Sequence, residues 1–88
     1  MAELIHEYST HVRSSQGARF VPRTYGEQRS DGTWIGWLEF VPTSHHVPTL
    51  RTDRETSQPN RQALEYWASG LEPVYLEGAF ARAQLVTV

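Results

Sequence analysis

The first half of the chain contains several short stretches in which apolar and polar residues alternate. Residues 4–12 place Leu4, Tyr8 and Val12 on one side of an extended chain, which is the period of two expected of a strand. Further β-rich runs cover residues 18–28, 33–41 and 50–56. The last run is short and charged, which is typical of an edge strand because charges discourage pairing with another chain. The pattern predicts three to four antiparallel strands.

The period changes after residue 57, where apolar residues recur at the spacing of one helix face. The recurring positions of this first helix are Leu64, Trp67, Ala68 and Leu71. We expect Ser57 to cap the helix and Pro59 to lie in its first turn. Gly70 should end it, with Leu71 closing a Schellman-type contact.

A second helix is predicted to begin at Pro73, and its apolar residues repeat the same spacing. These residues are Leu76, Ala79, Phe80 and Ala83. A chain of 88 residues has apolar side chains for only one core. The predicted fold is a single small α+β domain over residues 1–88. It consists of a three- to four-stranded antiparallel sheet followed by a C-terminal two-helix hairpin packed on one face.

Asp31 and Gly32 give a strong hairpin signal, because Asp-Gly between two β-rich runs is typical of a two-residue type I′ turn. Such a turn pairs Ser30 with Thr33 and fixes the register. One face then carries Trp34, Leu38 and Phe40 opposite Arg29, Tyr25 and Arg23. The other carries Ile35, Trp37 and Val41 opposite Gln28, Gly26 and Pro22, with Phe20 beyond. A turn of different length would shift this pairing by one residue.

Two short helices can cover one face of a small sheet but not both. We assign the face with Ile35, Trp37, Val41 and Phe20 to the core, because no arginine falls on it. The other face would meet solvent, a partner or a second copy of the chain. Its candidate binding residues are Arg23, Tyr25, Arg29, Trp34 and Phe40. Arginines beside aromatic rings can simply shield them, or they can form a binding surface, since Trp, Tyr and Arg are enriched in interface hot spots.

Composition narrows the function classes only slightly. The formal net charge of -2 argues against a dominant grip on phosphate backbones. All 8 basic residues are arginine, which a GC-rich coding sequence would explain without any function. The chain has no cysteine, so neither a disulfide nor a thiolate zinc site can form. Since we recognise no secretory signal and no membrane-spanning run, we expect a cytoplasmic protein without a membrane partner.

Residues for catalysis are sparse. No phosphate-binding loop, nucleophile elbow or zinc-protease motif occurs. His45 and His46 are adjacent in a loop without carboxylate or thiolate partners at a known spacing, so we interpret them as solvated. Asp53 and Glu55 share one side of a short strand, but the neighbouring Arg51 and Arg54 indicate a surface ion-pair cluster. We therefore expect no catalytic residue, no metal and no cofactor.

The leading hypothesis is a small non-catalytic module that uses the exposed aromatic and arginine face to bind a protein partner or to self-associate. Single-stranded nucleic-acid binding through the same face is the alternative, because aromatics and arginines on a sheet form a platform for bases. The net acidity counts against it. An enzyme dependent on a metal or a small molecule is the least supported. Residues 54–78 resemble the core of a bacterial family, but the resemblance implies no activity.

Overall fold

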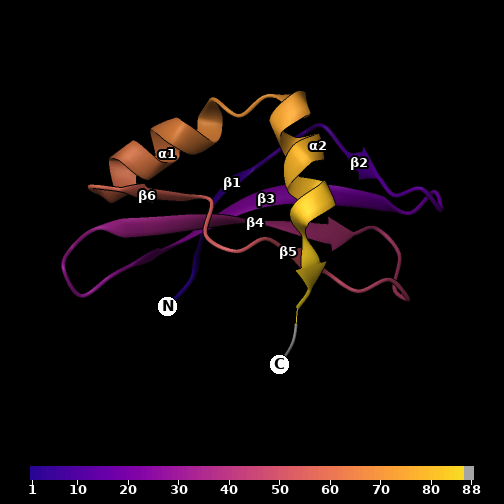
Figure 1. The fold of residues 1–88 in the computed structure, drawn as a ribbon, viewed down its shortest axis with the longest axis horizontal. Coiled ribbons are helices and arrows are strands. Elements are labelled where there is room, and N and C mark those ends of the chain that lie inside the picture. Colours follow the sequence, from indigo (N-terminus) through magenta and orange to yellow (C-terminus); the bar gives the residue numbers. More distant parts are fainter. Residues whose placement is uncertain (87–88) are drawn as a thin grey trace.

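The computed structural model describes residues 1–86, which form an open antiparallel sheet and two helices (Figure 1). The strands are β1 (Glu3–Glu7), β2 (Val12–Arg13), β3 (Arg19–Gln28), β4 (Trp34–Pro42), β5 (Leu50–Arg51), β6 (Thr56–Gln58) and β7 (Gln84–Leu85). The helices are α1 (Arg61–Ser69) and α2 (Pro73–Arg82). The strand order is β1-β3-β4-β5-β7, with β2 also paired to β3 and β6 to β4. The predicted α+β class is confirmed, but the sheet of 7 strands is larger than predicted.

The additional strands arise mainly because both predicted flanking strands are interrupted. β1 and β2 pair with the same side of β3, and β5 and β6 pair with the same side of β4. Thr52 is still bonded to β4, since its amide donates to the Leu38 carbonyl at 2.9 Å. Glu55 rejoins the strand through its amide and the Gly36 carbonyl at 2.8 Å. Residues 53–54 bulge out between these two bonds.

The turn between β3 and β4 has three residues, not the two that the Asp31-Gly32 signal predicted. The Arg29 amide donates to the Thr33 carbonyl at 2.7 Å, and the Gly32 amide donates to the Arg29 carbonyl at 3.0 Å. Gly32 has a φ of 90°, which is the left-handed position that follows a type I turn in such hairpins. The Asp31 carboxylate accepts bonds from the amide and the hydroxyl of Thr33, which closes the turn and lowers the pKa of Asp31.

One extra turn residue shifts the register by one and reverses the two faces of β4. Tyr25 pairs with Trp37, and Gly26 pairs with Gly36. The assignment of β3 was right, since Phe20 lies in the core. The assignment of β4 was wrong, because the face with Leu38 and Phe40 lies under the helices. Side chains alternate strictly along a strand, so a slip of one residue exchanges every position.

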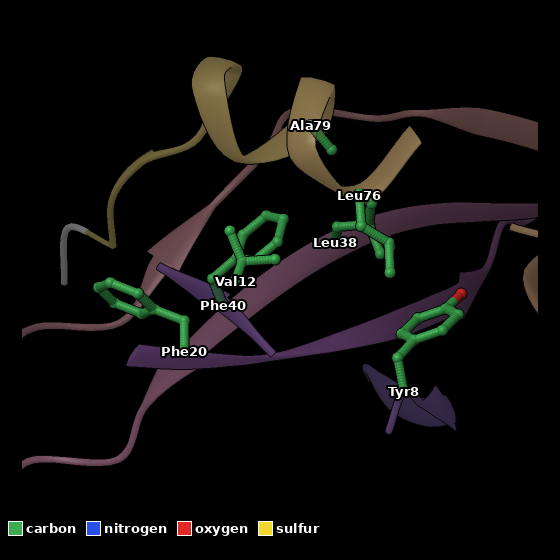
Figure 2. Packing of buried hydrophobic residues seen from close by; sticks show 7 residues of the cluster. All are labelled: Tyr8, Val12, Phe20, Leu38, Phe40, Leu76 and Ala79. Carbon is green, nitrogen blue, oxygen red and sulfur yellow. The ribbon is translucent and has the colours of Figure 1, made fainter. Parts of the chain in front are cut away.

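The main core lies between the sheet and α2. Figure 2 shows Leu76 and Ala79 of α2 above Leu38 and Phe40 of β4, with the other members of the cluster around them. Those other members are Tyr8, Val12 and Phe20. The Tyr8 hydroxyl is buried and donates to the Ala68 carbonyl at 2.7 Å, while it shares a second bond with the Thr24 hydroxyl at 2.7 Å. These bonds connect the residue that follows β1, and Thr24 of β3, to α1.

Both helices cover the same face of the sheet, but they do not pack side by side as a hairpin. In Figure 1, α1 lies beside β6 and β1, while α2 runs in another direction near β2 and β5. The cap of α1 is Asn60 and not Ser57, because the Asn60 side chain accepts a bond from the Ala63 amide at 2.8 Å. Gly70 ends α1 at a φ of -93°, so the predicted Schellman ending is wrong. Pro73 begins α2 as predicted.

Candidate functional site

The face of the sheet opposite the helices is the candidate functional surface, and we call it the open face. Strand alternation and register place its residues. They are Leu4 and Glu7 of β1, Arg13 of β2, Arg19, Val21, Arg23, Tyr25 and Glu27 of β3, Ile35, Trp37, Glu39 and Val41 of β4, Arg51 of β5, Ser57 of β6 and Gln84 of β7. Figure 1 shows no helix on this side of the described chain.

The five predicted site residues do not share one surface. Arg23 and Tyr25 lie on the open face, and Arg29 lies at the β3–β4 turn. Trp34 and Phe40 lie on the helix side, where their exposed fractions are 8% and 0%. Arg61 at the start of α1 lies 5.9 Å from the Trp34 ring centre. Trp34 and Phe40 are therefore core residues, and their placement on an exposed face was wrong.

Trp37 lies on the open face but is also enclosed, with an exposed fraction of 3%. The Arg51 guanidinium lies 4.4 Å from its ring centre, and Tyr25 stacks on its other flank with ring centres 6.5 Å apart. The Trp37 indole N–H donates to Glu39 at 3.0 Å. Both tryptophans of β4 are thus covered within a single chain. The argument that one tryptophan-bearing face must remain exposed was wrong, and shielding by arginine is what covers Trp37.

The apolar surface that remains on the open face is made of smaller side chains. Val21 lies directly opposite Val41, and both are half-buried. Ile35 and Tyr25 are also half-buried, and Leu4 is 47% exposed. Val21 could have been found from the alternation of residues 18–28 alone. Ile35 and Val41 could not, because their face depends on the length of the turn.

Arginines occupy the open face at several points and differ in their partners. Arg23 donates to the Tyr25 hydroxyl at 3.4 Å and pairs with Glu7 at 2.7 Å, and the bond to Tyr25, followed by the bond to Glu7, raises the pKa of Arg23. Arg13 and Arg19 are exposed and lie directly opposite each other across β2 and β3. Within residues 1–86, neither has a carboxylate within 4.0 Å. Sequence reasoning missed this like-charge pair because the residues are separated by a loop.

An apolar groove lies at the end of the sheet, on the helix side. Its volume is about 380 Å³. Phe20, Leu50 and Phe80 contribute apolar surface, and Ser14, Gln16 and His46 contribute polar groups. A second hollow of about 290 Å³ lies beside β5 and β7 and includes Arg51, Asp53 and Arg54. Ser14 and His46 line the same apolar groove, but within residues 1–86 no hydrogen bond joins them, and the Ser14 hydroxyl oxygen accepts bonds from the Gln16 and Ala18 amides at 3.3 and 3.1 Å.

The carboxylates predicted to form an ion-pair cluster are arranged differently. Glu55 accepts bonds from the Tyr75 hydroxyl and from Arg82, each at 2.5 Å, so it connects the edge of the sheet to α2. Arg51 covers Trp37 instead of pairing with a carboxylate. His45 and His46 are exposed in the β4–β5 loop. Among the described residues, no three His, Cys, Asp or Glu side chains are grouped so that they could hold a metal ion.

No helix within residues 1–86 has the length and apolar character needed to cross a membrane. In comparisons with known proteins, no family, no curated protein and no solved structure matches this chain. The resemblance of residues 54–78 to a bacterial family therefore gains no support.

Proposed function

We propose that this chain is a small non-catalytic binding module that docks a protein partner, or a second copy of itself, on the open face of its sheet. The main support for this proposal is that both helices lie on the same face of the sheet. The opposite face presents Val21 and Val41, which pair at one end of β3 and β4, and Ile35 near the other end of β4, all half-buried, with Leu4 exposed beside Tyr25. Apolar side chains that a chain leaves without cover are typical of interaction surfaces.

The proposed surface differs from the one expected from the sequence. Arg23 and Tyr25 remain part of it, whereas Trp34 and Phe40 are replaced by Val21, Ile35 and Val41. Apolar residues beside Arg and Tyr are a composition that suits the centre of an interface. The binding surface is therefore still the sheet face opposite the helices, but its β4 residues are not the ones expected from the sequence.

Binding of single-stranded nucleic acid is the second candidate. The stacked rings of Tyr25 and Trp37, with Arg23 and Arg51 beside them, are the observation that favours it. The position of Arg51 over the Trp37 ring counts against it, because a base could stack there only after displacing the guanidinium. The formal net charge of -2 counts against it as well.

The proposal is tested by placing a charge on either side of the molecule. Val41→Glu puts a carboxylate on the open face, and Val74→Glu puts the same group on α2, where Val74 is 77% exposed. Each protein is studied by sedimentation over a range of concentrations and by selection of peptides from a random library displayed on phage. We expect Val41→Glu to weaken self-association or peptide binding by about tenfold or more, because a buried unpaired charge at an interface is costly.

Val74→Glu should behave like the wild type in both measurements. Circular dichroism and thermal melting show whether each variant remains folded. The proposal is wrong if Val41→Glu folds and associates or binds as the wild type does. It is also wrong if the wild type stays monomeric and selects no peptide.

A further inference from the structure

We infer that the partner of the open face is an acidic protein segment whose carboxylates meet Arg13 and Arg19 and whose apolar side chains cover Val21 and Val41. This inference rests on the proposed function and adds the chemistry of the partner. The observation behind it is an unfavourable pairing of two positive charges, those of Arg13 and Arg19, within the sheet. Arg13 and Arg19 are direct cross-strand partners on β2 and β3, and like charges at such a pair of positions destabilise a sheet.

The fold does not relieve this repulsion by itself. No carboxylate of residues 1–86 lies within 4.0 Å of either guanidinium, although Arg23, Arg61 and Arg82 each have such a partner. Arg51, on the same face, also has no carboxylate within that distance in the described part of the chain. On the open face, Arg13 and Arg19 are thus available to an acceptor from outside the described chain, whereas Arg23 is already paired with Glu7.

The residues next to Arg13 and Arg19 indicate what kind of molecule would carry the carboxylates that bind them. The next open-face position along β3 is Val21, and it lies opposite Val41 of β4. Both side chains are half-buried, so an occupant that extends from the arginines along β3 meets two apolar side chains next. A carboxylate held next to an apolar side chain satisfies both requirements. An acidic protein segment with interspersed apolar residues has this chemistry.

A nucleic-acid strand fits the same surface less well. Glu7, Glu27 and Glu39 lie on the open face among the arginines, and closely spaced phosphates would be repelled by them. The Trp37 ring is covered by Arg51, which leaves no free aromatic platform there. A protein segment can place its carboxylates at Arg13 and Arg19 only and present neutral residues elsewhere. The observations therefore favour the protein segment.

The test uses a random peptide library displayed on phage, with a labelled oligothymidylate as a second probe. Peptides selected on the wild type should be enriched in Asp and Glu next to apolar residues. Synthetic versions of these peptides should bind the double variant Arg13→Glu/Arg19→Glu about tenfold or more weakly, because like-charge contacts across an interface are costly. The oligothymidylate should bind neither protein.

The matched control is Arg29→Glu/Arg54→Glu, which makes the same change in net charge at two exposed arginines outside this pair. It should bind the selected peptides within about twofold of the wild type, since charges far from the contact are screened by salt. The single variant Arg19→Glu provides a control for folding. It converts a like-charge pair into an opposite-charge pair, so its melting temperature should rise while its peptide binding falls.

The possible failures can be told apart. Selected peptides without an acidic preference, whose binding is still lost in Val41→Glu, would overturn the acidic partner and leave the docking face in place. Oligothymidylate binding that is lost in Arg13→Glu/Arg19→Glu would replace the protein segment by a nucleic acid. A wild type that stays monomeric and selects no peptide would remove both the inference and the proposed function.

Discussion

Glu55 shows how single side chains hold the two layers of this molecule together. Its carboxylate is largely buried and accepts the Tyr75 hydroxyl and the Arg82 guanidinium, each at 2.5 Å. Burial is the main cause that raises the pKa of Tyr75 to about 12, and the bond to Glu55 adds to it. The neutral phenol is therefore the form that the folded state stabilises.

This shift predicts a dependence of stability on alkaline pH. The folded pKa of Tyr75 is about 12, above its ordinary value of 10.0. Its contribution to the free energy of unfolding is thus complete below pH 10 and is lost as the pH rises through about 12. Tyr75→Phe has no phenol to ionise, so it should lose less stability over this range than the wild type does. Urea unfolding at a series of pH values measures the difference.

Tyr66→Phe is the control, because Tyr66 is exposed on α1. It should follow the wild type at every pH. Part of the alkaline loss should persist in Tyr75→Phe, since burial also raises the pKa of Tyr8. An unchanged alkaline loss in Tyr75→Phe would show that burial and the contact with Glu55 do not favour the neutral phenol of Tyr75.

Single residues also show where sequence reasoning succeeds. Arg23 and Tyr25 were placed on the uncovered side of β3, because strand alternation needs no knowledge of the partner strand. The cap of α1 was misplaced, since both Ser57 and Asn60 are good capping residues and only one begins the helix. Ser57 instead belongs to β6, where it pairs with Ile35. When two good capping residues lie three positions apart, the sequence alone does not show which of them begins the helix.

Among the elements, the contact between α1 and the sheet depends on two glycines. Gly26 of β3 and Gly36 of β4 are cross-strand partners, and Leu64 of α1 packs over both. A Cβ at Gly36 would lie 2.7 Å from Leu64 Cδ1, and one at Gly26 would also overlap the Leu64 side chain. The pair of glycines lets α1 approach the sheet closely. The sequence pointed to Trp37 as the residue over Gly26, and this pairing was wrong.

Gly36→Ala should therefore destabilise the protein by about 1–3 kcal/mol, which is typical of overpacking a core. Denaturant unfolding measures this change. Gly78→Ala on α2 is the matched control, because its Cβ would lie at an ordinary 3.6 Å from Arg82 Nη1. It should stabilise the protein by up to about 1 kcal/mol through helix propensity. Leu64→Ala should lower the free energy of unfolding by less in the Gly36→Ala variant than in the wild type, because the overlap is removed. If the two losses simply add, Leu64 does not contact Gly36 as described.

The hairpin shows why elements are easier to predict than their pairing. The runs that form β3 and β4 were recognised, but their register depends on whether Ser30 belongs to the turn. Ser-Asp-Gly suits a three-residue turn as well as Asp-Gly suits a two-residue one. A difference of one turn residue decides which side of β4 meets the helices. Because the register was predicted one residue off, Trp34 and Phe40 were wrongly included in the candidate binding site.

At the scale of the whole molecule, the prediction that the helices cover one face of the sheet agrees with the structure. The prediction of an exposed tryptophan does not, because Arg51 covers Trp37 and the helices cover Trp34. Arg51 shields Trp37 with a long side chain from a neighbouring strand, and the spacing of apolar residues along the sequence does not predict such a contact. On the face without helices, Val21 and Val41 lie opposite each other and are half-buried, and Arg13 and Arg19 lie next to them along the sheet.

The most direct test of the docking face is to locate a bound peptide by NMR. A peptide selected on the wild type is titrated into protein with labelled methyl groups. We expect the methyl signals of Val21, Ile35 and Val41 to shift, while those of Leu50 in the groove and of Val74 on α2 stay in place. Shifts at Leu50 without shifts at Val21, Ile35 and Val41 would place the ligand in the groove and contradict binding on the open face.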